Sequence, residues 1–179
     1  GGTNEELILQ IAARIVKDMK EMKPEAWIDW QIAGDQSPVW ALIVGNYSDI
    51  SHPVSKADSY YIRAQFSRFI KPGYTIVDCK DPNTLAAINP DKTELVLVIC
   101  NETSATVSHS YNLEAFQTAG PAIQRYRSGK VNDSYYERLA KINVTLSGKV
   151  LDYIAPKYSV TTFVIPVQVS TSTIGEGKY

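Results

Sequence analysis

Apolar residues near the start of the chain recur at every third or fourth position, which places them on one stripe of a helix. This stripe contains Leu7, Ile8, Ile11, Ile15, Met19 and Met22. Thr3 and Glu6 have the spacing of a capping box, and Pro24 follows the stripe. The pattern therefore predicts an amphipathic helix that ends before residue 24.

Residues 26–31 are rich in aromatic and β-branched side chains and predict a short strand. Residues 33–54 contain many Gly, Pro, Asp, Asn and Ser residues and predict a long loop, a feature that is often functional in a compact domain. Ser55 and Asp58 form a second capping box, which opens a helix that ends at Lys71-Pro-Gly. Helix and strand thus alternate, as in an α/β unit.

After Gly73 the apolar pattern changes to a period of two, which is typical of strands. Strand-like runs lie at residues 75–79, 85–88, 95–100, 105–111, 122–127, 142–146 and 160–165. Residues 135–139 are interpreted as either a helical turn or a bulged loop. Short strands at this spacing favour an antiparallel β-sandwich, so we expect a mainly β chain. Residues 168–179 are predicted to be a flexible tail.

Composition and charge exclude several classes of protein. The chain of 179 residues is 44% hydrophobic and 21% charged, which are ordinary values for a globular protein. Its 18 basic and 19 acidic residues are interspersed, so we expect no nucleic-acid partner. The longest apolar run, residues 95–100, is far too short for a transmembrane helix. No secretory signal is recognisable at Gly1, although a mature or cut chain would look the same.

The candidates for metal chemistry are few. Cys79, Cys100, His52 and His109 do not have the spacing of a ligand set, so we expect no metal and no cofactor. Both cysteines are interpreted as small core residues, and a disulfide between them stays open. Both histidines are interpreted as surface or hydrogen-bonded residues rather than catalytic ones.

Five segments, taken in order, resemble the C-terminal third of glycoside hydrolase family 30. They are Ala26-Trp-Ile-Asp-Trp-Gln and residues 60–73, 95–101, 126–128 and 158–163. The run from Phe66 to Gly73 is the most specific, and the resemblance covers roughly residues 5–166. This family includes glucosylceramidases, endo-β-1,6-glucanases and galactanases, and glucuronoxylanases. Its members have a (β/α)8 barrel fused to a side β-sandwich.

The resemblance implies a division of the chain at Gly73. Residues 1–72 would be the terminal segment of the barrel, namely helix seven, strand eight and helix eight. Residues 73–167 would be the β-sandwich side domain. The expected fold is therefore mainly β, with a C-terminal antiparallel β-sandwich preceded by two helices and one strand that resemble the end of a (β/α)8 barrel.

Retaining glycoside hydrolysis requires two carboxyl groups, one acting as acid and one as nucleophile. The resemblance places both glutamates of the family upstream of Gly1, so we expect no catalytic residue in this chain and no activity of the chain alone. Asp29 and Asp35 are the acidic residues closest to the expected barrel mouth. We interpret Asp29 as hydrogen-bonded locally and Asp35 as a solvated turn residue.

Trp30 and Gln31 are the candidate substrate-binding residues that the resemblance implies. An indole face suits the apolar C–H surface of a pyranose, and the Gln31 amide is a partner for a sugar hydroxyl. In the alternative, Trp30 lies in the barrel core and Trp27 is the ring that faces the loop, since adjacent strand residues point to opposite sides. Trp40 is interpreted as an anchor for its loop.

Two functions remain open at this stage. The first is the C-terminal part of a secreted retaining β-glycoside hydrolase that acts on a polysaccharide or glycoconjugate, with the sandwich bracing the barrel. The second is an independent carbohydrate-binding or adhesion module, and a structural remnant without glycan binding is a weaker third. Four glycosylation patterns, at Asn46, Asn101, Asn132 and Asn143, weakly favour an extracellular or periplasmic location. We also predict self-association through the apolar face of the first helix, if that face is exposed.

Overall fold

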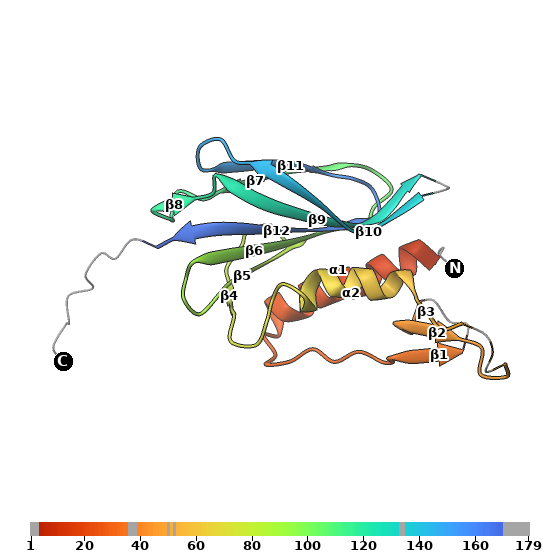
Figure 1. The fold of residues 1–179 in the computed structure, drawn as a ribbon. Coiled ribbons are helices and arrows are strands. Elements are labelled where there is room, and N and C mark those ends of the chain that lie inside the picture. Colours follow the sequence, from red (N-terminus) through yellow and green to blue (C-terminus); the bar gives the residue numbers. More distant parts are fainter. Residues whose placement is uncertain (1–3, 36–38, 50, 52, 133–134, 170–179) are drawn as a thin grey trace, which may run out of the picture.

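Two helices lie between a large antiparallel sheet and a small sheet of three short strands (Figure 1). The structure is a computed structural model that describes residues 4–35, 39–49, 51, 53–132 and 135–169. The helices are α1 (Asn4–Glu21) and α2 (Asp58–Ser67). The small sheet has the order β1-β2-β3, with β1 (Ala33–Asp35) parallel to β2 (Ile43–Gly45) and β2 antiparallel to β3 (Ser55–Lys56).

The large sheet has the strand order β10-β9-β12-β6-β5-β4, and β8 pairs with the end of β12. Its strands are β4 (Thr75–Val77), β5 (Thr84–Ile88), β6 (Glu94–Asn101), β8 (Thr118–Ala119), β9 (Ala122–Asn132), β10 (Tyr135–Thr145) and β12 (Ser159–Gln168). A two-stranded sheet of β7 (Val107–Asn112) and β11 (Val150–Ala155) lies on the face opposite the helices (Figure 1). The expected mainly β fold with an antiparallel sandwich is confirmed.

Strand β6 is buried on both faces, which explains its unbroken apolar sequence. Val96, Val98 and Cys100 face the helices, whereas alternate residues such as Leu97 and Ile99 face the two-stranded sheet. Successive side chains of a strand point to opposite faces, so one strand contributes to two cores. The large sheet is therefore the central layer of the molecule.

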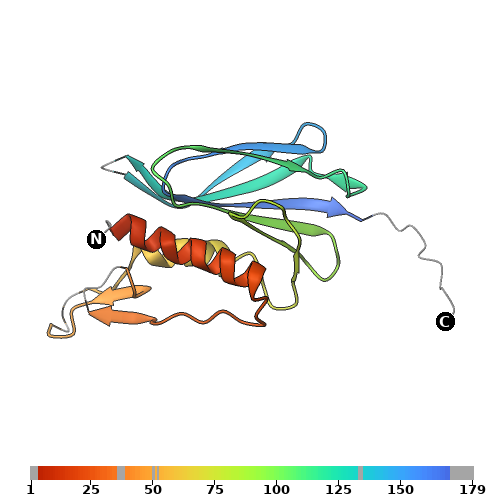
Figure 2. The ribbon, with the colours of Figure 1, turned by 180° about the vertical axis from the view of Figure 1, so that it is seen from behind.

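Helix α1 lies along one face of the large sheet in the view from behind (Figure 2). Most of its apolar stripe is buried in the core that it shares with that sheet or packs against this core, whereas Met22, just after the helix, is exposed. Leu9 and Ala12 are fully buried, and they belong to the same core cluster as Ile62 of α2 and Val160 of β12. The expectation that self-association would use an exposed face of this helix is therefore wrong in its premise. The first seventy residues also do not close a core of their own, because their apolar side chains share one with the sandwich.

Buried polar contacts fix α2 on the same sheet. The Gln65 side chain is fully buried, donates from Nε2 to Ser128 Oγ at 2.8 Å, and accepts from Thr162 Oγ1 at 2.6 Å. Buried polar groups are costly unless they are paired, so these contacts specify one orientation of the helix. Within the described residues, neither helix is both long and apolar enough to span a membrane.

Several predicted element boundaries are wrong. Residues 26–31 are not a strand, and the first strand is Ala33–Asp35, within the segment predicted to be a loop. Backbone hydrogen bonds to the segment before β2 begin only at Gln31, whose N–H donates to the Trp40 carbonyl at 3.3 Å. Ser55 does not cap α2, because it pairs with Val44 in the small sheet and Ala57 occupies the cap position without a side-chain bond.

The C-terminal half also differs in two places. Residues 135–139 are part of β10 rather than a helical turn, with register irregularities after Tyr135 and between Glu137 and Ala140 that correspond to the bulged alternative. Strand β11 was not predicted. The expected tail lies largely outside the described residues, which end at Val169.

Candidate functional site

The segment before β1 presents two different faces. On one face, Trp27 packs against the core between the helices and the large sheet, and its Nε1 donates to Asp18 Oδ2 at 3.2 Å. Asp29 forms an ion pair with Arg63 of α2. On the other face, Ile28, Trp30 and Ile32 are 89%, 78% and 71% exposed. The alternation follows from the extended backbone. The outward face is thus apolar and open to solvent.

Trp30 therefore lies on the outward face and Trp27 on the inward face. Trp27 is thus not the more exposed of the two rings, and whether Trp30 contacts a sugar or packs in the expected barrel stays a prediction. The peptide bond between Trp30 and Gln31 is cis. Gln31 is half-buried, and its backbone bonds to the neighbouring segment through Trp40 and Leu42. The structure places the two predicted substrate-binding residues side by side at the start of the small sheet, and their contact with a sugar stays a prediction.

The two acidic residues near this segment make local contacts. Asp29 Oδ1 accepts the Trp30 backbone N–H at 2.8 Å, and Asp35 Oδ1 accepts the Tyr47 N–H at 3.4 Å. Trp40 is 55% exposed, and its role as an anchor for the loop stays a prediction. The described contacts of Asp29 and Asp35 assign them to holding backbone rather than to chemistry.

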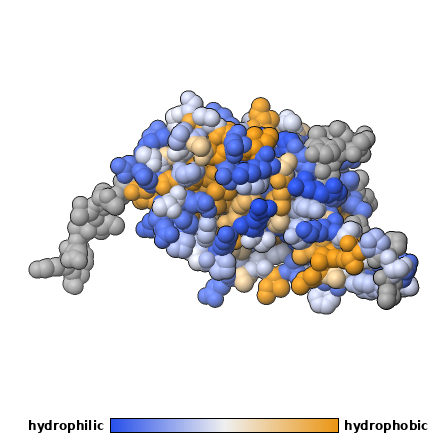
Figure 3. All heavy atoms as spheres, in the orientation of Figure 1, coloured by the Kyte–Doolittle hydropathy of each residue, from blue (hydrophilic) through white to orange (hydrophobic). Residues whose placement is uncertain are grey.

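Apolar surface gathers over the small sheet, at the lower right of Figure 3. The large apolar side chains exposed in and around this sheet are Ile28, Trp30, Ile32, Trp40, Tyr47 and Val54. Apolar patches of this kind on a soluble protein usually mark a binding surface or an interface. We call this surface, formed by these six residues, the apolar face of the small sheet.

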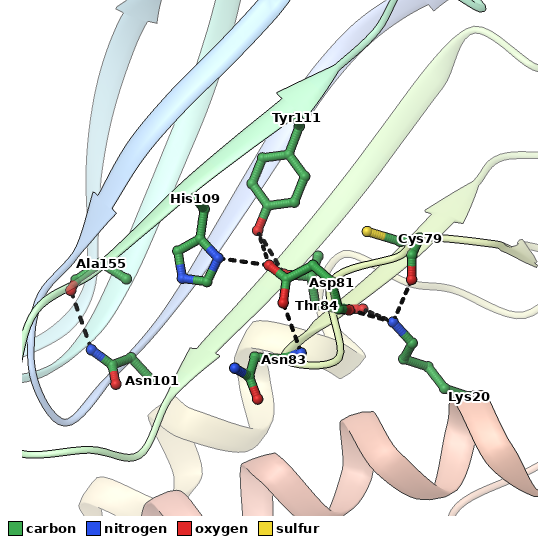
Figure 4. A network of polar contacts seen from close by, with 9 residues as sticks. All are labelled: Lys20, Cys79, Asp81, Asn83, Thr84, Asn101, His109, Tyr111 and Ala155. Carbon is green, nitrogen blue, oxygen red and sulfur yellow. Dashed lines mark hydrogen bonds and ion pairs between the residues drawn. The ribbon is translucent and has the colours of Figure 1, made fainter.

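A second constellation, which the sequence analysis missed, centres on the Asp81 carboxylate (Figure 4). Its Oδ2 atom accepts hydrogen bonds from Thr84 Oγ1 at 2.9 Å and Tyr111 OH at 2.9 Å, and lies 2.6 Å from His109 Nδ1. Its Oδ1 atom accepts the Asn83 N–H at 2.9 Å. The only sequence signal was the spacing of His109 and Tyr111, two residues apart on one face of a strand.

Lys20 of α1 approaches the same loop from the other side. Its ammonium donates to the carbonyls of Cys79 at 2.7 Å, Thr84 at 3.0 Å and Asp81 (Figure 4). An ammonium carries three donor hydrogens, so these bonds use its full capacity. The loop from Cys79 to Thr84 is therefore tied to α1 through its backbone and to β7 through the Asp81 side chain.

Burial is the largest influence on the Asp81 carboxyl and favours its neutral form. The hydrogen bonds from the Asn83 N–H, Tyr111, His109 and Thr84 outweigh burial and hold the pKa of Asp81 below its ordinary value. Burial also raises the pKa of the Tyr111 hydroxyl, which stays protonated as a donor. The network is a partly buried charge whose two oxygens both accept hydrogen bonds, an arrangement that stabilises the fold.

The histidines and cysteines have no described role in chemistry. His109 is buried, and its Nε2 has no hydrogen-bond partner among the described residues. His52 lies outside the described residues. Both cysteines are free, and Cys100 of β6 is buried in the core between the large sheet and the helices. Across the described part of the chain, no three His, Cys, Asp or Glu side chains are grouped to hold a metal ion.

Comparison with known proteins agrees with this architecture. The chain is 31% identical over 106 residues to an endo-β-1,6-galactanase from Hypocrea rufa, a match that covers 59% of this chain and 21% of the galactanase. It is 28% identical over 138 residues to the glucuronoxylanase XynC from Bacillus subtilis (strain 168), covering 75% of this chain and 31% of the xylanase. The chain thus spans about a fifth to a third of these relatives. No family model matches the chain.

Solved structures show the same fold. A glycoside hydrolase family 30 subfamily 8 xylanase from Clostridium acetobutylicum superimposes with a TM-score of 0.72 at 24% identity, covering 93% of this chain and 40% of the xylanase. The catalytic domain of a family 30 xylanase from Talaromyces cellulolyticus gives 0.64 at 22% identity, covering 88% and 34%. The resemblance to the C-terminal third of family 30 enzymes, first stated from the sequence, is confirmed.

Proposed function

We propose that the chain is the C-terminal part of a secreted retaining β-glycoside hydrolase that acts on a polysaccharide or glycoconjugate. In this proposal a preceding barrel segment carries the two catalytic glutamates. Residues 26–35 complete that barrel, and the β-sandwich braces it. The chain alone is then inactive.

One observation carries the proposal, namely the apolar outward face of residues 28–32. A segment that packs on helices with one side and exposes Ile28, Trp30 and Ile32 on the other has the pattern of a barrel strand whose neighbours lie elsewhere. The half-exposed Gln31 beside Trp30 supplies an amide for a sugar hydroxyl. The Trp30 indole supplies an apolar platform for the face of a pyranose.

The names of the relatives support the substrate class, since a galactanase and a glucuronoxylanase both act on polysaccharides. Polysaccharides are too large to cross a cell membrane unaided, so secretion belongs to the same proposal. The sandwich contributes by holding α1 and α2, on which the substrate-facing segment rests.

The test is to express the complete reading frame beside residues 1–179 and to measure reducing-sugar release from β-1,6-galactan and from glucuronoxylan. We expect the complete protein to hydrolyse one of them and residues 1–179 to hydrolyse neither. In the complete protein, Trp30→Ala should lower kcat/KM by about tenfold or more, which corresponds to ~1.4 kcal/mol of transition-state stabilisation. Trp40→Ala is the matched control because Trp40 is also exposed but is not assigned to the substrate.

Two results would overturn the proposal. One is a reading frame that encodes no barrel before this chain. The other is glycan binding by residues 1–179 alone with no hydrolysis by the complete protein, which would favour an independent carbohydrate-binding module.

A further inference from the structure

Asp29 connects α2 to the backbone of Trp30. Its Oδ2 atom accepts a hydrogen bond from Arg63 Nε, and its Oδ1 atom accepts the Trp30 N–H at 2.8 Å. A carboxylate that uses its two oxygens for two separate donors links them through one planar group. The position of the Trp30 backbone is thereby tied to a helix rather than to its own loop.

Arg63 holds this link from the buried side. It is only 8% exposed, and its Nη1 donates to the carbonyl of Ser59 at 3.4 Å, one turn earlier in α2. Its Nη2 is buried without a hydrogen-bond partner in the described part of the chain. Asp29 is therefore the carboxylate that compensates this guanidinium, and charge-assisted bonds of this kind are strong and directional.

The Trp30 ring makes no hydrogen bond to the described residues. The ring is 78% exposed, so its place depends on the backbone on either side. On the following side, the Gln31 N–H donates to the Trp40 carbonyl at 3.3 Å, and the Gln31 carbonyl accepts from Leu42 N–H at 3.3 Å. Within the described residues, the Asp29 carboxylate is the one acceptor of the Trp30 N–H. The two attachments together set the direction in which the indole projects.

We propose that Arg63 and Asp29 are positioning residues for Trp30, which fix the indole for stacking on the sugar. This inference rests on the proposed function for the identity of the ligand, a pyranose unit of the substrate. Neither residue touches the sugar. Small displacements of a substrate-contacting group reduce rates steeply, by up to about 100-fold per ångström.

The structural part of the proposal can be tested on residues 1–179 labelled with 15N-tryptophan. The three tryptophans give separate backbone amide signals, which single Trp→Phe variants assign. We expect the Trp30 amide to be shifted by its carboxylate partner and protected from hydrogen exchange. In Arg63→Lys the charge stays but the Nε donor of the planar guanidinium is lost, so the Trp30 amide signal should move and exchange about tenfold faster.

The matched control is Arg127→Lys. Arg127 Nε donates to Glu137 in another partly buried pair, between β9 and β10, and this pair does not involve Trp30. The control should leave the Trp30 amide signal unchanged. If Arg63→Lys does not fold, Asp29→Asn answers the same question, because it replaces one of the two acceptor oxygens by an NH2 donor, which cannot accept from the Arg63 Nε or the Trp30 N–H. A Trp30 amide that is unchanged in the folded variants overturns the proposal.

The functional part is tested in the complete protein on whichever of β-1,6-galactan and glucuronoxylan it hydrolyses. Arg63→Lys should lower kcat/KM by about tenfold, and Arg127→Lys should leave it unchanged. A changed Trp30 amide with unchanged kcat/KM overturns the positioning role but leaves the proposed function standing. Absence of hydrolysis by the complete wild-type protein overturns the proposed function, and with it the sugar as the ligand of Trp30.

Discussion

Lys20 and Asp81 meet at the boundary between α1 and the large sheet, where the Lys20 ammonium donates to the Asp81 backbone carbonyl. The Asp81 side chain turns the other way, toward His109 and Tyr111 on the second sheet. One loop residue therefore joins the helix layer to both sheets of the sandwich.

Replacing Lys20 by Met should destabilise the protein by about 1–3 kcal/mol, because three partly buried carbonyls lose their donor while the aliphatic stem is kept. Urea unfolding followed by circular dichroism measures the change. Lys17→Met on the exposed side of the same helix is the control and should change the free energy of unfolding by less than about 0.5 kcal/mol. Equal effects of the two substitutions would contradict the role assigned to Lys20.

Asp81 should make the protein sensitive to acid. Its pKa is lowered in the folded state, so its contribution to stability is present above the unfolded value of about 3.9 and is lost as the pH falls through the folded value. In Asp81→Asn the free energy of unfolding should therefore be smaller at pH 7 and should fall less between about pH 5 and pH 2. Asp78→Asn, which removes an exposed charge near the same loop, is the control. Parallel pH profiles for wild type and Asp81→Asn would refute the prediction.

The two cysteines should differ in reactivity. Burial, followed by the nearby Glu102 charge, raises the pKa of the Cys100 thiol, and only the thiolate is nucleophilic. In the native protein, Cys79→Ser should therefore release no colour from Ellman's reagent until urea is added, whereas Cys100→Ser should react through Cys79. Rapid reaction of native Cys79→Ser would contradict this prediction, because it would show that the Cys100 thiol is accessible to the reagent in the folded protein.

Residues 1–179 on their own should self-associate through the apolar face of the small sheet rather than through α1. The double substitution Ile28→Ser and Ile32→Ser should shift light scattering toward a monomer, since it removes the two most exposed isoleucines of that face. Ile154→Ser is the matched control because Ile154 is 65% exposed on β11, at a distance in the fold. A monodisperse wild-type monomer would contradict this prediction.

The sequence was sufficient where one face of an element is apolar. The stripe of α1 was predicted because its period places the apolar side chains on one face. The run of β6 was predicted for a different reason, since an unbroken apolar stretch of this length is typical of a strand buried on both faces. Strand β11 was missed for the opposite reason. There Val150 and Ile154 face solvent while the small Ala155 is buried, so the apolar pattern does not distinguish its two faces.

Features that depend on distant partners could not be predicted. Asp81 is separated by about 30 residues from the His109 and Tyr111 side chains that it meets. Asn101 matched a glycosylation pattern, but it is 2% exposed and its Nδ2 donates to the carbonyls of Ala105, Ala155 and Pro156. The sequence did not decide which of the two rings is exposed, and the structure shows that Trp27 packs on the helices while Trp30 faces solvent.

The shared core between the helices and the large sheet limits how this protein can be divided. A cut at Gly73 would separate Leu9 and Ile62 from Val98 and Val160, and would expose one apolar face of the large sheet to solvent. The β-strands are therefore not a portable unit that can be transferred to another protein by themselves. A fusion or truncation that is meant to keep the sandwich folded must carry both helices with it.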